Sequence, residues 1–253
     1  MSKIISAILS VFLLLSSGNT PVNKAENWYI KKGDQGSTPT FPPSIEYIRS
    51  QNGFCIDEDA AKSGLKVIYL TFDAGYENGN IARILDVLRE KEVCAAFFIL
   101  SNLIHKNPEL VKQMVADGHT VCNHTKNHKD MTTLSNEDME INLKALDDQF
   151  ESLTGVKMAK YFRFPEGRYS EEKVALCNSL GYRCVFWSAA YADWDNNKQS
   201  DSETALKKLI SQTHPGAVYL LHPTSKTNAD ILAQLIDTWR NMGYEFGSIE
   251  DIS

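Results

Sequence analysis

Positive charge is scarce in this sequence of 253 residues. Lysine and arginine number 26 against 32 aspartates and glutamates, which gives a net charge of −6. No nucleic-acid partner is expected, because phosphate binding requires a basic surface. Glycine and proline, at 14 and 8 residues, are too few for a collagen-like or low-complexity chain. Cysteine occurs five times, and an odd number argues against a complete disulfide framework.

The sequence also lacks a long apolar run, but its N-terminus has the pattern of a secretory leader. Lys3 precedes an apolar run over residues 4–15, and the small residues 16–18 follow. A bilayer span needs roughly 20 apolar residues, whereas a leader needs only a basic start and a short apolar stretch. We predict that residues 1–25 are a signal peptide or an N-terminal membrane anchor, since no clean cleavage motif precedes Ala25. The alternative is a buried N-terminal helix.

The rest of the composition is that of a globular protein, with 43% hydrophobic and 23% charged residues. A chain of this length can bury a sizeable core. Residues 26–64 show little periodicity, and we predict an extended arm whose aromatic residues pack on a domain of residues 65–253. Those aromatic residues include Trp28, Tyr29 and Phe41.

From Lys66 onward, short apolar runs alternate with amphipathic stretches, a pattern typical of βα units. Because a regular barrel of such units has eight strands, the pattern predicts an α/β fold of the irregular (β/α) barrel type, with about seven parallel strands. The helices include one capped by Ser135 and ended by Gly155, and another that begins at Asn228. The predicted strands are residues 66–72, 94–100, 120–123, 161–163, 183–188, 218–221 and 244–247.

Polar residues gather at the carboxyl ends of these strands. Asp73, His124 and His222 each follow a strand, Arg163 ends another, and Asp193 lies in the loop after a fifth. In parallel α/β folds, ligands bind and catalysis occurs at this end of the sheet. We therefore predict a functional site there.

Two histidines have the spacing of metal ligands. His124 and His128 would share one face of a helical turn, which suits a single metal ion. Taken alone, each signal has a plainer alternative. The histidine pair could be solvated loop residues, Asp73 could cap a loop, and His222 could be a core histidine.

Taken together and in this order, five segments resemble the motifs of the polysaccharide deacetylases, the NodB homology domain or carbohydrate esterase family 4. The resemblance begins near Asn52, extends to the C-terminus, and implies a NodB-like barrel with a catalytic role for the domain of residues 65–253. The segments are residues 71–75, 124–128, 163–167, 193–194 and 220–222.

Within that family, residues 52–54, 68–79 and 191–194 are similar to the branch of delta-lactam-biosynthetic de-N-acetylases. Enzymes of this branch deacetylate N-acetylmuramic acid in peptidoglycan. Their reaction is a step towards the muramic δ-lactam of bacterial spore cortex.

The resemblance implies a role for each central motif residue. His124 and His128 would hold a divalent metal ion (Zn, Mn or Co) that polarises the acetamide carbonyl and activates water. Asp73 would be the general base, and His222 would be the general acid that protonates the departing amine. Arg163 would orient Asp73.

The surrounding residues would support these roles. Asp193 would hold Arg163, and backbone N–H groups near Pro165 would help to stabilise the oxyanion. Trp194 and Leu220 would line the substrate groove. Arg168 is a candidate partner for the lactyl carboxylate of muramic acid, the alternative being a solvated loop arginine.

The sequence departs from the family pattern at Phe164 and Glu166 of the third motif and, with more consequence, in the first motif. The first motif usually contains two adjacent aspartates, the second of which is a metal ligand, but Ala74 stands at that position here. Two protein ligands remain, fewer than the three of a catalytic zinc site. We predict weak or exchangeable metal binding, with water or substrate at the open positions.

The sequence thus predicts an exported, metal-dependent hydrolase of amide bonds that deacetylates N-acetylmuramic acid in the peptidoglycan strands of the cell wall or spore envelope. The resemblance also implies a functional partner, a muramoyl-alanine amidase. One alternative is a deacetylase of N-acetylglucosamine in peptidoglycan or chitin-like glycans. The other is a glycan-binding pseudoenzyme that lost its metal through Ala74. The oligomeric state is not indicated.

Overall fold

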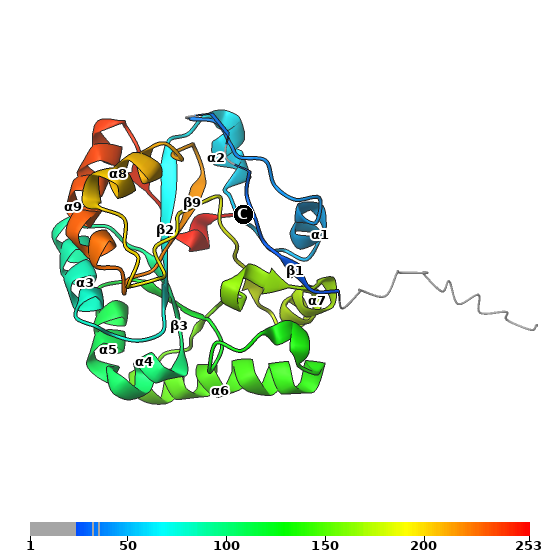
Figure 1. Ribbon diagram of the computed structural model, residues 1–253. Helices are drawn as coiled ribbons and strands as arrows, with labels where there is room; N and C mark the ends of the chain where they lie inside the picture. The colour runs from blue at the N-terminus through cyan, green and yellow to red at the C-terminus, as the bar shows by residue number, and fades with distance from the viewer. Residues whose placement is uncertain (1–23, 32, 35) are drawn as a thin grey trace, which may run out of the picture.

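A parallel sheet forms the centre of the structure (Figure 1). The computed structural model describes residues 24–31, 33–34 and 36–253, so the predicted leader lies outside the described residues except for Lys24 and Ala25. The strands of the parallel sheet are hydrogen-bonded in the order β7-β5-β4-β3-β2-β9-β8, and β10 pairs with β2. Their bounds are β2 Val67–Ala74, β3 Ala96–Ile99, β4 Thr120–Asn123, β5 Ala159–Phe162, β7 Arg183–Cys184, β8 Ala189–Ala190, β9 Ala217–Leu221 and β10 Glu245–Phe246.

The sheet curls back on itself because β7 and β8 belong to one stretch of chain. β7 pairs with β5 at one end of the strand order, and β8 pairs with β9 at the other. Only residues 185–188 separate them. Each of the seven predicted strands is present, and the predicted strand 183–188 begins with β7 and stops just before β8. The prediction of an irregular (β/α) barrel is confirmed.

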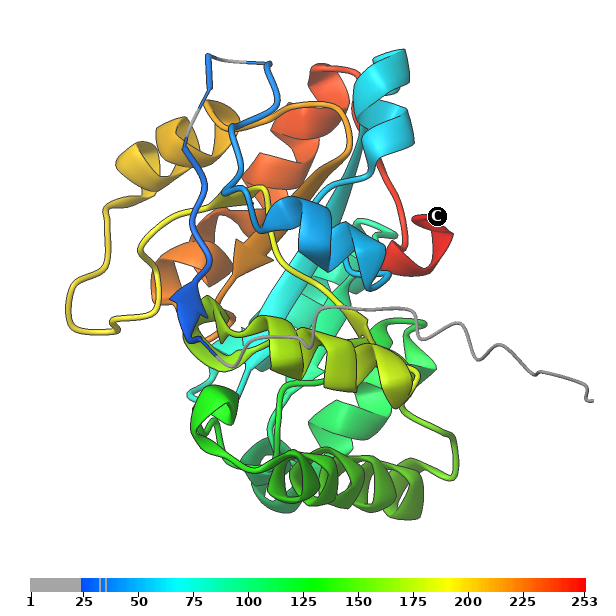
Figure 2. The same cartoon turned by 90° about the vertical axis from the view of Figure 1, so that its right-hand side faces the viewer.

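Helices connect the strands and surround the sheet, as Figure 1 and the turned view in Figure 2 show. α6 begins as predicted, with the Ser135 hydroxyl accepting the N–H of Asp138, and ends at Gly155. α9 begins two residues before the predicted start, because Ser225 is its cap and Asn228 donates its N–H to that cap. The α-helices that follow β2 are α3 Asn80–Glu90, α4 Ser101–Lys106, α5 Pro108–Ala116, α6 Asn136–Thr154, α7 Glu171–Ser179, α8 Ser202–Ile210 and α9 Lys226–Asn241. In the described part of the chain, no helix has the length and hydropathy to cross a bilayer.

The prediction of an extended arm over residues 26–64 is only partly right. The strand β1 (Glu26–Asn27) is extended, but α1 (Ile45–Ser50) and α2 (Glu58–Ser63) are helices. Each has six residues, too few for a hydrophobic period to be recognised in a sequence. The one feature of the sequence that could have indicated α2 was a polar N-cap, since the Asp57 side chain accepts the N–H of Ala60 at the start of this helix.

The start of the arm packs on the barrel through one tryptophan. β1 pairs antiparallel with β6 (Arg168–Tyr169), and the Trp28 ring lies 4.7 Å from that of Phe186 between centroids. Trp28 is buried, whereas Tyr29 is 58% exposed. The arm was predicted to pack its aromatic residues on the domain. Trp28 does so, whereas Tyr29 does not.

The end of the arm is paired with barrel strands. Phe54 forms a bridge with Val185, and Ile56 forms one with Ala217. The arm and the barrel thus share backbone hydrogen bonding across the boundary predicted at residue 65.

Alternation along the strands divides the core into two faces. Leu70 and Phe72 of β2 belong to the cluster that faces the helices, whereas Tyr69 belongs to a cluster inside the barrel. Because successive side chains of a strand point to opposite faces, Thr71 and Asp73 share the inner face with Tyr69. The inner cluster also contains Phe54, Ala96, Phe98, Cys122, Val185, Val218, Ile249 and Ile252.

Gly216 tests how closely the arm is fitted to the barrel. Its φ is +73°, and a Cβ at this position would lie 2.2 Å from the carbonyl oxygen of Asp57. Gly216→Ala should lower the free energy of unfolding by about 2–4 kcal/mol, because left-handed strain and steric overlap add. Gly155→Ala is the matched control, since its φ is +76° and no atom lies within 4 Å of the added Cβ. The control should cost about 1 kcal/mol in urea denaturation, and equal losses would contradict the close fit.

Candidate active site

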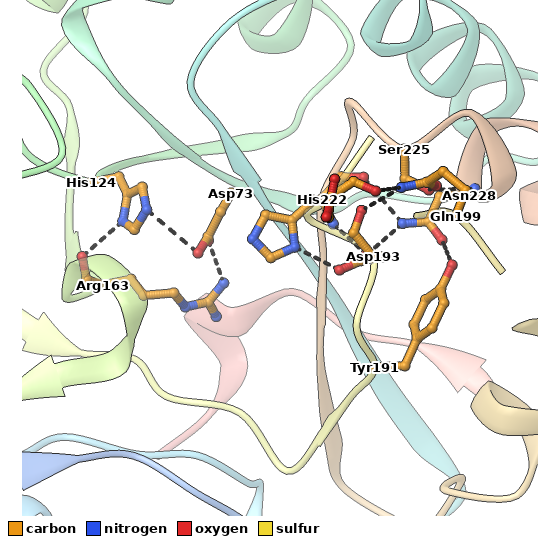
Figure 3. Close-up of polar contacts among 10 residues, drawn as sticks. Asp73, His124, Arg163, Tyr191, Asp193, Gln199, His222, Ser225 and Asn228 are labelled. Carbon is orange, nitrogen blue, oxygen red and sulfur yellow. Dashed lines mark hydrogen bonds and ion pairs between the residues drawn. The ribbon is translucent and has the colours of Figure 1, made fainter. Parts of the chain in front are cut away.

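The inner strand faces lead to the predicted site residues at the carboxyl ends of the strands. His124 lies two residues beyond Cys122, and His222 lies four residues beyond Val218, so both continue an inner face. Asp73 lies on the inner face of β2, and Arg163 directly follows β5. Figure 3 shows Asp73 between His124 on one side and His222 on the other.

A buried ion pair between Arg163 and Asp73 forms the centre of the site. The Arg163 Nη1 donates to Oδ1 of Asp73 at 2.8 Å, and its Nη2 donates to the Thr71 hydroxyl at 2.8 Å. Its Nε donates to the carbonyl oxygen of Val185 at 3.1 Å. Because its guanidinium donates to three acceptors and only 1% of its surface is exposed, the Arg163 side chain is held in a single conformation. It contacts Asp73, the residue that it was expected to orient, and Thr71 is a partner that sequence reasoning missed.

His124 presents a lone pair towards Asp73. Its Nδ1 lies 2.9 Å from the carbonyl oxygen of Arg163, and because a carbonyl oxygen can only accept, Nδ1 carries the proton. Burial lowers the pKa of His124 to about 4, so the ring is neutral at pH 7 and Nε2 is an acceptor. Nε2 lies 3.5 Å from Oδ2 of Asp73. Two atoms with free lone pairs, Nε2 of His124 and Oδ2 of Asp73, thus face each other, and a bound cation would stabilise this arrangement.

The prediction of a helical turn between His124 and His128 is wrong. The connecting residues form an irregular loop in which Thr125 and His128 have positive φ, 78° and 56°. The two rings nevertheless come together, with centroids 5.1 Å apart. A positive φ costs of order 1–3 kcal/mol at a non-glycine residue, so neighbouring contacts must hold this loop.

Those contacts come from Asn123 and from α6. The Asn123 side chain accepts the N–H of Thr125 at 2.9 Å, and the Thr125 hydroxyl accepts the N–H of His128 at 2.8 Å. The amide of Asn123 in turn donates to Asp147 on α6 at 2.9 Å. Asn142, also on α6, accepts the N–H of Lys126 at 2.8 Å. Sequence reasoning missed these positions, because asparagine and aspartate on a helix look like an ordinary solvated face.

His222 is paired with Asp193. The Nδ1 of His222 lies 2.7 Å from Oδ1 of Asp193, and the His222 N–H donates to Oδ2 at 2.8 Å. Asn228 also donates to Oδ2, at 2.6 Å (Figure 3). The prediction that Asp193 holds Arg163 is therefore wrong. Both residues follow strands at the same end of the barrel, but the barrel places Asp193 beside β9 rather than beside β5.

The two ion pairs shift the pKa values of Asp73 and His222 in opposite directions. Burial works to raise the pKa of Asp73, but His124, Arg163 and His222 together lower it. Burial works to lower the pKa of His222, but the attraction and hydrogen bond of Asp193 raise it. An ionised carboxylate and a readily protonated imidazole therefore lie in one site, a combination suited to general base and general acid catalysis.

The donors present fit a divalent ion held by two imidazoles. Nε2 of His124 is free to bind it, and the His128 ring lies alongside. Ala74 is fully buried in the helix-facing cluster, so the position of the family's second aspartate offers no ligand. Among the described residues, no three histidine, cysteine, aspartate or glutamate side chains are arranged to hold a metal ion. An ion here would take its other ligands from water or substrate.

The predicted substrate residues lie on the same strand ends. Trp194 is 63% exposed, and its ring centroid is 6.3 Å from that of His222. Leu220 is buried two residues before His222 on β9, and so shares its face. Pro165 begins the short helix η2 (Pro165–Gly167) and is buried. Only Trp194 thus offers a broad exposed surface.

Arg168 is already occupied by a protein carboxylate. Its Nε lies 2.7 Å from Oδ2 of Asp130, two residues beyond His128. Arg168 is also the partner of Asn27 in the pairing of β6 with β1. It therefore joins three segments and is neither a free cation for a lactyl group nor a merely solvated arginine.

Comparisons with known proteins point to one family. The family model described as polysaccharide deacetylase matches residues 60–185. The peptidoglycan-N-acetylmuramic acid deacetylase PdaA of Bacillus subtilis is 35% identical over 99% of this chain and 95% of its own length. The solved structure of that family 4 carbohydrate esterase has a TM-score of 0.86 at 36% identity, covering 91% of this chain and 97% of its own. An uncharacterised 30.6 kDa protein of Geobacillus stearothermophilus is 39% identical over 97% of this chain and 92% of its own length.

Removing one imidazole tests the metal site. In calorimetric titration with Zn²⁺, the wild type should bind one ion weakly, and His128→Ala should reduce the affinity about tenfold or more because it removes one of two protein ligands. His105→Ala, which removes an exposed histidine of α4, is the matched control and should bind as the wild type does. Equal affinities for the two variants would exclude the His124–His128 pair as the metal site.

Proposed function

The chain belongs to the polysaccharide deacetylases, the family 4 carbohydrate esterases, and from that premise we propose that it hydrolyses the N-acetyl group of N-acetylmuramic acid in peptidoglycan. The observation that carries the proposal is the presence of two ion pairs in one site, Arg163 with Asp73 and Asp193 with His222. The choice of muramic acid is supported by the similarity to PdaA over nearly the whole of both chains.

Asp73 is placed to take a proton from the attacking water. Arg163 occupies its Oδ1, whereas Oδ2 faces the imidazole of His124. Proton transfer to Oδ2 lets the water oxygen bond to the carbonyl carbon, which gives a tetrahedral oxyanion. A divalent ion held by His124 and His128 would polarise the acetamide carbonyl and make the water more acidic.

His222 is placed to complete the reaction. Asp193 holds its Nδ1, so Nε2 is the nitrogen left to meet the substrate. The protonated ring donates from Nε2 to the amide nitrogen, the C–N bond breaks, and acetic acid and the free amine leave. Asp73 then gives up the proton it took and His222 regains one, so the site returns to its starting state.

We extend the proposal to the setting of the reaction. The enzyme is exported, secreted or anchored by its N-terminus, and acts on the glycan strands of the cell wall or spore envelope. Its product leads towards muramic δ-lactam after a muramoyl-alanine amidase has removed the stem peptide. Support comes from the leader-like residues 4–15, from the similarity of residues 68–79 and 191–194 to the δ-lactam branch, and from the substrate named for PdaA.

Mass spectrometry of muropeptides tests the reaction. Peptidoglycan strands with and without stem peptides are incubated with the enzyme and Zn²⁺. Muramic acid should lose its acetyl group while glucosamine keeps its own, and strands without stem peptides should react faster. Asp73→Asn should lower kcat by about 10²–10⁴-fold, because it removes the general base, and should still bind Zn²⁺.

Two other outcomes would contradict the proposal. Deacetylated glucosamine beside intact muramic acid would indicate the N-acetylglucosamine deacetylase. The same trace of acetate from the wild type and from Asp73→Asn would indicate a glycan-binding pseudoenzyme.

The pH profile tests the role of Asp193. A general acid must be protonated, so the rate falls as pH rises through the pKa of His222. Asp193 raises that pKa, and Asp193→Asn should therefore move the alkaline limb of the kcat profile to lower pH while leaving the acidic limb in place. Asp195→Asn, a partly exposed carboxylate of the same loop, is the control. An unmoved alkaline limb in Asp193→Asn would exclude His222 as the acid.

A further inference from the structure

Tyr76 is an exposed aromatic residue beside the site that the mechanism does not use. We propose that Tyr76, with Asn196 and Trp194, forms a second sugar-binding site for the pyranose next to the one that is deacetylated. The substrate would then be recognised as a glycan strand and not as a single sugar. This inference rests on the proposed function.

The positions of the acid and of the imidazole pair fix the direction in which the substrate lies. The amide nitrogen must approach His222, whereas the carbonyl oxygen must point towards His124 and His128. The nitrogen is bonded to the sugar ring, so the ring lies on the His222 side of Asp73. Trp194 is the exposed aromatic residue on that side, with its ring centroid 6.3 Å from that of His222.

Tyr76 is connected to the same side. It lies in the loop between β2 and α3, three residues after Asp73. Its hydroxyl accepts a hydrogen bond from the amide of Asn196 at 2.6 Å, and Asn196 lies two residues after Trp194. A sugar joined to the one beside Trp194 can therefore reach Tyr76.

The loop that carries Tyr76 is held in place by several hydrogen bonds. The Glu77 carboxylate accepts the N–H groups of Gly79 and Ile81. The amides of Asn78 and Asn80 donate to the carbonyl oxygen of Thr224, two residues after His222, at 2.8 and 3.0 Å. Because its loop is fixed, Tyr76 loses little conformational freedom when a ligand binds.

The exposure of Tyr76 and Trp194 indicates the chemistry of the ligand. Tyr76 is 48% exposed and Trp194 is 63% exposed. An exposed aromatic surface costs free energy in water, and its presence beside a site marks a binding surface. The C–H face of a pyranose packs on such rings, and the Tyr76 hydroxyl and Asn196 amide supply partners for sugar hydroxyls. The other large hydrophobic side chains exposed in the described ranges are Tyr29, Leu65, Ile141 and Val156.

Kinetics on two substrates tests the second sugar site. The enzyme is assayed with Zn²⁺ on N-acetylmuramic acid as the single sugar and on glycan strands freed of stem peptides. The wild type should show a lower KM for strands than for the single sugar. Tyr76→Ala should raise the KM for strands about tenfold more than the KM for the single sugar, which corresponds to about 1.4 kcal/mol of lost binding. Tyr76→Phe, which keeps the ring, should retain most of the preference for strands.

Tyr29→Ala removes an aromatic residue of comparable exposure from the arm and is the matched control, with no change expected for either substrate. A Tyr76→Ala variant whose two KM values rise equally, or do not rise, would overturn the second sugar site while leaving the proposed function in place. A wild type that releases no acetate from strands would overturn both.

Discussion

The buried charge of Arg163 is the constraint on which the site depends. A guanidinium that is 1% exposed must find its partners inside the protein. It finds them on Asp73 and Thr71 of β2 and on the carbonyl oxygen of Val185. These partners come from β2 and from the residue that follows β7, so the curvature of the barrel and the geometry of the Asp73 carboxylate are set together. The carbonyl oxygen of Arg163 also fixes the tautomer of His124, and one residue thereby orients both the Asp73 carboxylate and the His124 imidazole.

Much of the fold was predictable because strands obey a period of two and end at recognisable residues. The seven apolar runs became strands, and the polar residues that follow them became neighbours at one end of the barrel. Asp73, His124 and His222 continue the inner faces begun by Tyr69, Cys122 and Val218. Their convergence therefore follows from counting residues along each strand.

Partnerships between strand ends could not be predicted in this way. Asp193 was expected to hold Arg163, but the closure of the sheet through β8 and β9 places it on His222. The loop from His124 to His128 also escaped prediction, because its conformation depends on Asn142 and other residues that are distant in sequence. Spacing along a chain indicates which residues reach a site, whereas their pairing depends on how far the barrel has curled.

The pairing of β2 has a consequence for the order of folding. This strand lies between β3 and β9 and also pairs with β10, while Ile56 of the arm pairs with Ala217. The central strand therefore gains its full set of partners only when the last part of the chain is available. Contacts so distant in sequence slow folding. Because β9 and β10 lie near the C-terminal end of the sequence, the barrel can close only after nearly all of these 253 residues have been synthesised.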